Sequence, residues 1–346
     1  MVYVQSVFAV GVVGASGYAG AELLRLCHLH PQLEVAWATG ETQAGSLVAA
    51  LYPSLAAAYP SLSFRTFEPE PERAGGVDLV FLALPHGGSQ HVAGGLLDQG
   101  IKVVDLAADF RLRDPAVYER WYGEPHIAPR LIDRFAYGLP ELHRDEISKS
   151  DAVASAGCYP TAAALALAPL VAAGAIVPSG VIVDAASGLS GAGRALKHAT
   201  HFGTANEDFT AYGLLDHRHT PEMEQTIGAS LLFTPHLAPM TRGILATCYA
   251  RPVGAASTDD VIGVLADAYR GEPFVVVGPA SPSTKATWGS NSVHLTARYD
   301  ERTGWVVVVA ALDNLVKGAS GQAVQNANLL LGLEETTGLS SIGVYP

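Results

Sequence analysis

A single cysteine, Cys158, lies in the segment SAGCYPT (residues 155–161), between small residues and an apolar run that favours a helix. A thiol in the first turn of a helix faces unpaired N–H groups and the positive end of the helix dipole, which stabilise the thiolate. The thiolate is the nucleophilic form of cysteine. Most free cysteines are instead small buried hydrophobic residues, so the alternative for Cys158 is packing alone. The sequence therefore offers one candidate nucleophile, which needs partners to act.

A second candidate site is the segment DHRHTPE at 216–222. Two imidazoles beside an arginine and a carboxylate can supply a general base with an orienting partner. The alternative is a solvated loop, since a chain with 12 histidines contains some close pairs by chance. Because His217 and His219 are only two residues apart, the spacing does not match the helical zinc motif H-E-x-x-H. We therefore expect acid–base chemistry here and no metal.

Arginines at two places are candidates for binding an anionic substrate. Arg111 and Arg113 follow a predicted strand at 102–106, and α/β sheets bind ligands beyond the carboxyl ends of their strands. The guanidinium group matches phosphate geometry through paired donors. The alternative is surface ion pairing with neighbouring aspartates. A glycine-rich segment at 187–194 carries Arg194, and it either lines a cleft or forms a long turn.

Glycines at 11, 14, 17 and 20 follow the apolar run at 7–13. Glycine lets the backbone approach a pyrophosphate, whose charge is held by N–H groups at the start of the next helix. The spacing differs from G-x-G-x-x-G, and the alternative is an ordinary tight turn between a strand and a helix. Its position after a buried N-terminal strand favours dinucleotide binding.

The sequence leaves the phosphate state of that dinucleotide open. Glu41 follows the second predicted strand, where an acid favours a free ribose 2′-hydroxyl and an arginine favours a 2′-phosphate. Glu41 therefore indicates NAD, whereas Thr39, Thr42 and Ser46 offer hydroxyl groups to either cofactor.

Strands and helices alternate in the first half of the chain. Strand candidates lie at 7–13, 34–38, 77–84 and 102–106, and helical spacing lies at 21–30 and 89–98. This alternation predicts a Rossmann-like, doubly wound α/β domain that ends near Gly157.

The second half has a different pattern. Strand candidates lie at 181–185, 230–237, 243–252, 292–299 and 305–312, and helices are expected at 161–173, 258–269 and, in the tail, 318–332. The last two strands are expected to pair across the turn at 300–304. The pattern predicts an α+β domain with a largely antiparallel sheet.

Composition restricts the function further. The chain has 346 residues, a length that favours two domains. Its formal net charge of −12 argues against nucleic-acid binding. No apolar run approaches the roughly 18 residues of a membrane helix, and the first basic residue is Arg25, so neither a membrane anchor nor a secretory signal is expected. Three scattered cysteines indicate no disulfide framework or zinc site, and a reducing, cytoplasmic setting is expected.

Taken together, these segments resemble the N-acetyl-γ-glutamyl-phosphate reductase family, which is related to aspartate-semialdehyde dehydrogenase. The matches run in order along nearly the whole chain: GASGYAG (14–20), LALPHG (82–87), 105–112, YGLPE (137–141), AGCYPT (156–161), 187–194, 217–222, RGIL (242–245) and DNLVKG (313–318). The resemblance implies an NADP-binding Rossmann-like domain of residues 1–157 and 318–346, and a catalytic α+β domain of residues 158–317. It also implies a homo-oligomer, either a dimer or a tetramer.

The resemblance also assigns roles to residues. It implies that Cys158 is the nucleophile and that a histidine of the HRH segment is the acid–base group, with His217 placed first and His219 second. Arg111 or Arg113 would hold the phosphate, and Arg194 or Glu222 the other end of the substrate. Glu41 is unusual for NADP(H), so that cofactor follows from the resemblance. The predicted cofactor contacts are Gly14, Ser16, Gly17, Tyr18, Ala19, Thr39, Ser46, Pro85, His86, Gly191 and Asn314.

The implied reaction is a reductive dephosphorylation in arginine biosynthesis. Cys158 attacks the γ-acyl phosphate and expels phosphate, and hydride from NADPH converts the thioester to the semialdehyde. A related enzyme of lysine biosynthesis acts on an aminoadipyl phosphate, but that branch tends to place Asn after the cysteine, where this chain has Tyr159. A non-catalytic dinucleotide-binding protein and a dehydrogenase that does not use its thiol are the competing interpretations.

Overall fold

The computed structural model describes residues 6–68, 76–254 and 256–345, which form two compact units. Unit 1 contains the described residues up to 116, together with 124–156 and 319–339. Unit 2 contains 117–123, 157–318 and 340–345. The chain thus passes from unit 1 into unit 2 immediately before Cys158 and returns after Gly318.

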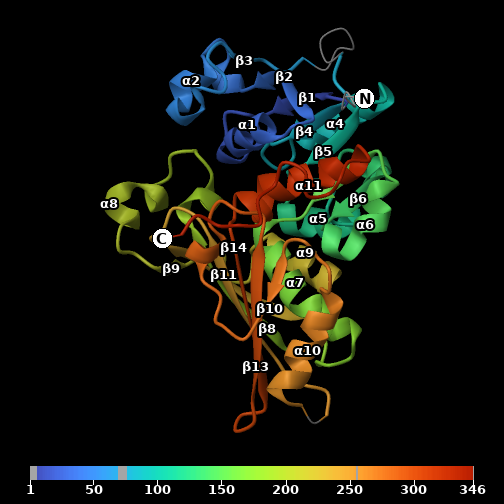
Figure 1. Cartoon of the computed structure of the whole chain (residues 1–346), viewed down its shortest axis with the longest axis vertical. Coiled ribbons are helices and arrows are strands. Elements are labelled where there is room, and N and C mark those ends of the chain that lie inside the picture. Colours follow the sequence, from blue (N-terminus) through green and yellow to red (C-terminus); the bar gives the residue numbers. More distant parts are fainter. Residues whose placement is uncertain (1–5, 69–75, 255, 346) are drawn as a thin grey trace, which may run out of the picture. The chain divides into compact units, whose positions relative to one another are not determined.

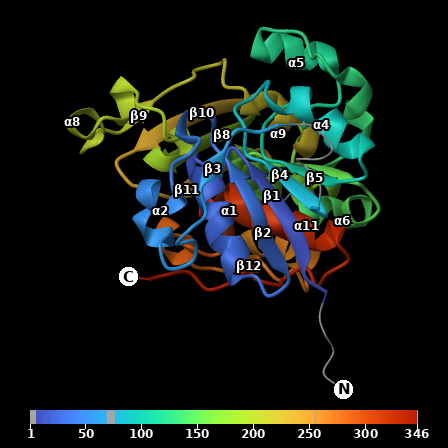
Figure 2. The same cartoon turned by 90° about the horizontal axis from the view of Figure 1, so that it is seen from above.

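Unit 1 is built on a parallel sheet, shown in blue and green in Figures 1 and 2. Its described strands have the order β3-β2-β1-β4-β5-β7-β6, and every neighbouring pair is parallel. They are β1 (Phe8–Val13), β2 (Leu33–Thr39), β3 (Phe64–Arg65), β4 (Leu79–Leu82), β5 (Lys102–Asp105), β6 (Phe135–Gly138) and β7 (Ala152–Ser155). The central strands are buried because parallel sheets have helices on both faces.

Helices cover both faces of this sheet. One apolar core contains residues of α1 (Tyr18–Leu29) and α11 (Gly321–Leu330) together with β1. A second core contains residues of α4 (Ser89–Asp98). Chain order reverses between the neighbouring strands β1 and β4, and in doubly wound folds such a switch point is where ligands bind. The turns after β1 and β4 are therefore the parts of unit 1 that matter for function.

Unit 2 contains a mixed sheet whose described strands have the order β12-β13-β14-β11-β8-β10-β9. Four of its six pairings are antiparallel, and β12–β13 and β8–β10 are parallel. The strands are β8 (Val181–Gly188), β9 (Thr210–Ala211), β10 (Leu231–Ala238), β11 (Ile244–Ala250), β12 (Val275–Val277), β13 (Val293–Asp300) and β14 (Trp305–Leu312). The hairpin predicted across 300–304 is present, and the fold class is confirmed.

Three helices of unit 2 pack against its sheet: α7 (Cys158–Ala172), α9 (His219–Ile227) and α10 (Thr258–Ala268) (Figure 1). Burial alternates along β8 and β11, so each strand presents one buried row of side chains and one half-exposed row. Among the described residues, no helix is long and apolar enough to cross a membrane.

The remaining helices in the described part of the chain have between four and nine residues. They are α2 (Val48–Leu51), α5 (Pro115–Tyr122), α6 (Pro140–Ser148) and α8 (Phe202–Ala205), with 3-10 turns at Glu41–Gln43, Pro53–Leu55, Pro129–Arg134, Leu189–Ala192, His198–Thr200 and Thr284–Thr287. A π-helical turn at Val316–Ser320 precedes α11.

The structure differs from the sequence predictions at several elements. The helix expected from residue 161 begins at Cys158, because Gly157 is the N-cap and its carbonyl accepts the Thr161 N–H at 2.8 Å. The helix expected over 318–332 is divided into the π-helical turn and α11. The last described residues, 340–345, group with unit 2 instead of the first domain, since Trp288 O accepts the Val344 N–H at 2.7 Å.

Candidate functional site

The glycine turn after β1 is a close-packed cradle. Gly14 has a φ of +79°, and a Cβ at this position would lie 2.3 Å from Ala83 O. A Cβ at Gly20 would lie 2.4 Å from Ala15 Cα, so α1 can approach the turn only with glycine there. Gly17 is the N-cap of α1 and makes no side-chain cap. These are the features that a pyrophosphate needs at a helix start, so the residues present fit a dinucleotide.

Neighbouring side chains fix the shape of this turn. Thr39 Oγ1 accepts the Gly14 N–H at 3.2 Å, and Thr39 O accepts the Ala15 N–H at 2.7 Å. Tyr52 donates its hydroxyl hydrogen to Ser16 O at 2.7 Å. The predicted contacts Tyr18 and Ala19 form the first turn of α1. Thr39 is therefore buried as a support of the turn, whereas the sequence suggested a hydroxyl offered to the cofactor.

At the end of β2, Glu41 contacts the chain itself. Its Oε1 accepts the backbone N–H of Phe67 at 3.0 Å. In the register of β2 and β3, Thr39 lies opposite Arg65, whose guanidinium group stacks over the Trp37 ring at 4.5 Å. Ser46 is half-buried, and its backbone N–H donates to Gln43 O. Arg65, which no sequence motif singled out, thus lies beside the carboxyl end of β2, the strand that Glu41 follows.

The turn after β4 carries the predicted contacts Pro85 and His86. Its conformation depends on Asp109, whose carboxylate accepts the N–H groups of Gly87 at 2.6 Å and Ser89 at 2.9 Å. Asp109 therefore occupies the positive N-terminal end of α4. Beneath it, Asp105 is fully buried, and burial, followed by the charge of Asp109, raises the pKa of Asp105 to about 7.

The two arginines after β5 contact the chain of unit 1. Arg111 is buried and donates from Nη2 to Leu106 O at 2.7 Å. Arg113 donates to Phe135 O at 2.8 Å and to Glu146 Oε1 at 2.9 Å. The Arg113 contact is an ion pair, although with a different acidic partner from the aspartates considered in the sequence.

Cys158 is the first residue of α7 and is half-buried. Gly157 immediately before it donates its N–H to Oε1 of the buried Glu222 at 2.8 Å. Thr161 also donates its hydroxyl hydrogen to Gly157 O at 2.8 Å, so both peptide groups of the N-cap are held. Pro160 has no N–H, so the N–H groups of Cys158 and Tyr159 lie at the positive end of the helix dipole.

Aromatic and imidazole rings cluster beside this helix start. Tyr159 lies edge-on to His217 and His219, with ring centroids 5.7 Å and 6.0 Å away. The two imidazole centroids are 5.0 Å apart. Tyr212 and Phe233 lie 5.5 Å and 5.2 Å from His217. The structure therefore brings the cysteine segment and the HRH segment together.

The tyrosine hydroxyls in this cluster form a chain of hydrogen bonds. Tyr212 donates to the Tyr159 hydroxyl at 3.2 Å, and Tyr159 donates to His236 O at 3.2 Å. Burial raises the pKa of Tyr212 to about 12, and the negative charge of the Cys158 thiolate acts in the same direction. The pKa of Tyr159 is raised by burial first and by Tyr212 and Cys158 in addition. Both phenols are therefore protonated at neutral pH and can donate hydrogen bonds.

His217 is neutral at physiological pH. Burial lowers its pKa to about 4, with Asp216 acting against this shift and Arg218 with it. His217 Nδ1 accepts the backbone N–H of His219 at 3.2 Å. The proton of the neutral ring therefore resides on Nε2, which makes that nitrogen a hydrogen-bond donor.

The π-helical turn packs directly against the cysteine. A Cβ at Gly318 would lie 2.8 Å from Cys158 Cβ, closer than side chains tolerate. Asp313 holds the start of this turn by accepting the N–H groups of Leu315 at 2.8 Å and Val316 at 3.2 Å. π-helical turns are rare and often occur at functional sites. The sequence motif DNLVKG predicted the importance of this segment but not its contact with Cys158.

Asn314 and Gly191 occur together in unit 2. Asn314 Oδ1 accepts the Gly243 N–H at 2.6 Å, and Asn314 Nδ2 donates to Ser190 Oγ at 2.9 Å. A Cβ at Gly191 would lie 3.7 Å from the same Nδ2 atom. Arg194 follows in this loop and is half-buried. These two predicted cofactor contacts therefore belong to a different unit from the glycine cradle.

The other two cysteines do not compete with Cys158 for the nucleophilic role. All three cysteines lie in the described part of the chain and are free thiols. Cys27 and Cys248 are buried, and burial raises the pKa of each to about 12. Among the described residues, no group of three or more His, Cys, Asp or Glu side chains is arranged to hold a metal ion.

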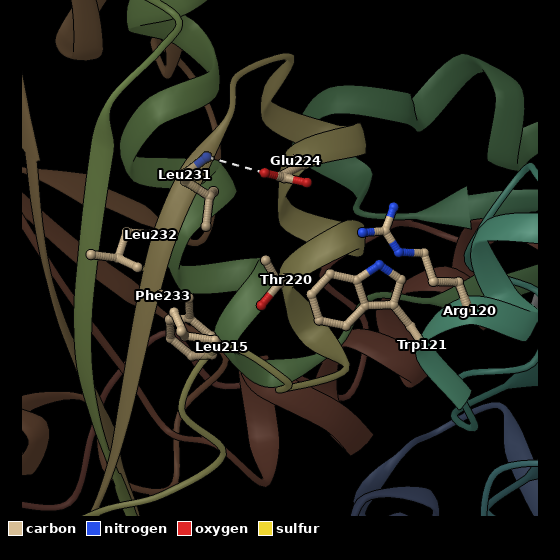
Figure 3. Close-up of a pocket in the computed structure, with 8 residues that line it drawn as sticks. All are labelled: Arg120, Trp121, Leu215, Thr220, Glu224, Leu231, Leu232 and Phe233. Carbon is tan, nitrogen blue, oxygen red and sulfur yellow. Dashed lines mark hydrogen bonds between the residues drawn. The ribbon is translucent and has the colours of Figure 1, made fainter. Parts of the chain in front are cut away.

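A separate pocket of about 300 Å³ shares Phe233 with the ring cluster (Figure 3). Arg120 and Trp121 come from α5, and Thr220 and Glu224 from α9. Its remaining lining residues are Leu215, Leu231, Leu232 and Phe233. Glu224 Oε1 accepts the Leu231 N–H at 3.2 Å, drawn as a dashed line in Figure 3.

Comparisons with known families agree with this two-part organisation. Residues 9–150 match the family model described as semialdehyde dehydrogenase, NAD binding domain. Residues 158–314 match the model described as semialdehyde dehydrogenase, dimerisation domain.

Two curated relatives have similar lengths and high identity. The chain is 50% identical over 345 residues to an N-acetyl-gamma-glutamyl-phosphate reductase of Desulforudis audaxviator (strain MP104C), covering 97% of this chain and 99% of that one. It is 48% identical over 347 residues to the protein of the same name from Symbiobacterium thermophilum, with the same coverage.

Solved structures share the fold at lower identity. Aspartate semialdehyde dehydrogenase II of Vibrio cholerae, complexed with ASA, superposes with a TM-score of 0.71 at 16% identity, covering 95% of this chain and 99% of that one. The Candida albicans enzyme, solved with NADP, gives a TM-score of 0.67 at 15% identity, covering 94% and 98%.

Proposed function

The chain belongs to the semialdehyde dehydrogenase family, and on this basis we propose that it catalyses the reductive dephosphorylation of N-acetyl-γ-glutamyl phosphate to N-acetylglutamate semialdehyde. This is an NADPH-dependent step of arginine biosynthesis. The observation that carries the proposal is the half-buried Cys158 at the start of α7, followed directly by Tyr159, whose ring lies edge-on to two imidazoles. The relatives named for this reaction, at 48–50% identity over nearly the full chain, support the substrate.

Cys158 is the acyl carrier in this mechanism. Its thiolate attacks the γ-carbonyl carbon of the acyl phosphate, the bond from that carbon to the phosphate oxygen breaks, and inorganic phosphate leaves. A thioester between Cys158 and the acyl group results. The N–H groups at the helix start stabilise the thiolate before attack and the developing oxyanion during it. Glu222 maintains the geometry by holding Gly157.

We propose different roles for the two histidines. Because His217 carries its proton on Nε2, it suits donation to the substrate oxygen, both in the thioester step and in the hemithioacetal that follows reduction. In this assignment His219 is the group that accepts the proton of the Cys158 thiol. This assignment differs from the order expected from sequence, in which His217 was placed first as the base. The protonated Tyr159 and Tyr212 exclude water from the rings and keep them oriented.

When bound, the nicotinamide cofactor supplies the hydride that reduces the thioester carbonyl. In unit 1 we propose that the dinucleotide is held by the cradle of Gly14, Ser16, Gly17, Tyr18 and Ala19, with contributions from Ser46, Pro85 and His86. Thr39 supports this cradle through its hydrogen bonds to Gly14 and Ala15. Gly191 and Asn314 of unit 2 are proposed to contact the same cofactor. The close glycine packing and the acid-free first turn of α1 support this assignment. We propose NADP(H) over NAD(H).

The anionic ends of the substrate need cationic partners. We propose Arg111 or Arg113 for the phosphate and Arg194 for the other end of the substrate; Arg111 also donates to Leu106 O, and Arg113 also pairs with Glu146. Glu222 is better described as a positioning residue for Cys158 than as a substrate contact, since its carboxylate is buried against Gly157.

We also propose that the protein works as a homo-oligomer in the cytoplasm. The half-exposed face of the sheet in unit 2, formed by alternate residues of β8 and β11, is the surface proposed to pair with a second copy. The match of residues 158–314 to a dimerisation domain supports this surface. Three free thiols suit a reducing compartment. We propose no nucleic-acid or membrane partner, since the substrates are small molecules.

Phosphate-dependent oxidation of N-acetylglutamate semialdehyde tests the function. The initial rate is compared with that of the homologue one carbon longer, using NADP⁺ and NAD⁺ in parallel. We expect NADP⁺ reduction that requires phosphate, with the shorter substrate preferred. Preference for the longer chain would assign the chain to the lysine branch, and no phosphate dependence would contradict acyl-phosphate chemistry.

A further inference from the structure

The pocket drawn in Figure 3 lies within unit 2, and the proposed reaction does not use it. Arg120 and Trp121, at the end of α5, form one side of the pocket, and residues 231–233, at the start of β10, form the other side. Its volume is about 300 Å³, at the lower end of the range for ligand pockets. The pocket therefore suits a molecule of amino-acid size and not a dinucleotide.

Four of the lining residues form an apolar wall: Leu215, Leu231, Leu232 and Phe233. Phe233 is buried, whereas Leu232 and Leu215 are 47% and 75% exposed. Leu215 also has a φ of +67°, a left-handed backbone conformation that residues other than glycine rarely adopt. Such strained positions persist only where the surrounding structure holds them, and they gather at sites that bind ligands. The apolar wall is thus a surface that the hydrocarbon part of a ligand can cover.

Three polar side chains face the same space, namely Arg120 from α5 and Thr220 and Glu224 from α9. Glu224 Oε1 accepts the Leu231 N–H at 3.2 Å, which holds the carboxylate in place and leaves Oε2 for a ligand. Within the residues that the structure describes, neither the Arg120 guanidinium nor the Thr220 hydroxyl has a hydrogen-bond or ion-pair partner. The pocket therefore presents one cation and one anion that are not paired with each other.

From this combination we propose that the pocket binds a free α-amino acid with an apolar side chain. The α-carboxylate pairs with Arg120, the α-ammonium group pairs with Glu224, and the side chain lies against the apolar wall. A guanidinium matches a carboxylate through paired donors, and charge-assisted hydrogen bonds are stronger than neutral ones. A simple anion or a simple cation fits less well, because each leaves one charge of the pocket facing a ligand of its own sign. The proposal does not depend on the reaction proposed above.

Calorimetric titration of the full chain with L-leucine and L-phenylalanine tests the proposal. Three further probes each lack one recognised feature: leucinamide has no carboxylate, 4-methylpentanoic acid has no ammonium group, and glycine has no apolar side chain. We expect saturable binding of at least one of the two amino acids, and binding of the three other probes that is weaker by about tenfold or more. No saturable binding of either amino acid up to about 10 mM would overturn the proposal.

Two conservative variants locate the bound amino acid. Arg120→Gln should raise its Kd by about tenfold or more and remove its advantage over the amide. Glu224→Gln should raise the Kd in the same way and remove the advantage over the acid without an ammonium group, while the new amide oxygen can still accept the Leu231 N–H. Folded variants that bind the amino acid as tightly as wild type would overturn its assignment to this pocket.

Arg302→Gln and Glu301→Gln, in the exposed turn between β13 and β14, are the matched controls. They should leave every Kd unchanged, and thermal unfolding verifies that each variant is folded. The titration is repeated with N-acetylglutamate semialdehyde present, because displacement of the amino acid would place it in the active site and overturn a separate pocket. A protein that binds the amino acid but does not oxidise the semialdehyde would instead overturn the proposed function alone.

Discussion

Glu222 Oε1 accepts the backbone N–H of Gly157 at 2.8 Å, one residue before the candidate nucleophile. The carboxylate is buried and comes from α9, the helix that begins at His219. One helix therefore carries an acid–base candidate in its first turn and, three residues later, the group that fixes the N-cap of the cysteine helix. This bond joins the HRHTPE segment (217–222) directly to the AGCYPT segment (156–161).

Removing this bond should impair catalysis more than folding. Glu222→Ala leaves a buried N–H unsatisfied, at a cost of about 1–3 kcal/mol, and releases the peptide before Cys158. We expect kcat/KM to fall about 10- to 100-fold, an effect that about 1 Å of misplacement can produce. Glu222→Gln is the control, since its amide oxygen can still accept the hydrogen bond. Equal losses in both variants would show that the charge, and not the bond, is what matters.

Gly318 should tolerate no side chain, because its Cβ would lie 2.8 Å from Cys158 Cβ. Gly318→Ala must displace either the π-helical turn or the cysteine, so we expect kcat/KM to fall about tenfold or more. Binding of 2′,5′-ADP, whose site is proposed in unit 1, should be unchanged. Gly263→Ala in α10 is the control: no atom lies within 4 Å of a Cβ there, and the helix should gain about 1 kcal/mol. Full activity in Gly318→Ala would contradict the packing argument.

Much of the fold followed from local pattern. The apolar run before Gly14 predicted β1, and alternation across 300–304 predicted the hairpin of β13 and β14. Strands β6 (FAYG) and β7 (AVAS) were missed because half or more of the residues in each are Ala, Gly or Ser, which have low β propensity, whereas β4, of the same length, is a continuous run of large apolar residues. The start of α7 was placed three residues late, because Pro160 suggested a boundary although proline is tolerated in the first turn.

The candidate site was only partly predictable, because tertiary contacts determine it. Residue types identified Cys158, the two histidines and the glycine cradle. The bond from Gly157 to Glu222 joins residues 65 positions apart, and no local pattern reports it. Tyr212 and Phe233 gave no motif signal, and their importance comes from packing against His217. The motif DNLVKG was the one clue that pointed to Gly318.

The roles of His217 and His219 can be distinguished by measuring how fast the Cys158 thiol is alkylated. If His219 accepts the proton of Cys158, His219→Asn should slow alkylation by iodoacetamide at pH 7 by about tenfold or more. His217→Asn should lose turnover while alkylation proceeds near the wild-type rate, because neutral His217 holds its proton on Nε2. His217 should also remain neutral down to about pH 4, where its ring titrates in an NMR experiment. Slow alkylation in His217→Asn alone would reverse the two roles.

Asp105 should make the protein less stable as pH rises. Its folded-state pKa is about 7 and its ordinary value is 3.8, so between these values the folded state holds a proton that the unfolded state has lost. The contribution of Asp105 to the free energy of unfolding is therefore complete below about pH 4 and is lost as the pH rises to about 7.

Asp105→Asn should remove this dependence, because the amide mimics the protonated acid. In urea unfolding we expect the variant to gain stability relative to wild type between pH 5 and pH 8, by on the order of 2 kcal/mol. Asp98→Asn, at an exposed position of α4, should show no such gain. A difference between Asp105→Asn and wild type that stays constant with pH would refute the raised pKa.

The thioester on Cys158 is the central claim, and intact-protein mass spectrometry tests it most directly. The protein is mixed with N-acetylglutamate semialdehyde and NADP⁺ in the absence of phosphate, so that an acyl group formed by hydride transfer has no acceptor. We predict a burst of about one NADPH per active site. We also predict an added N-acetylglutamyl mass on the peptide containing Cys158, which phosphate discharges and which Cys158→Ala lacks. A Cys158→Ala protein that still turns over, or a burst with no adduct on Cys158, would contradict the account.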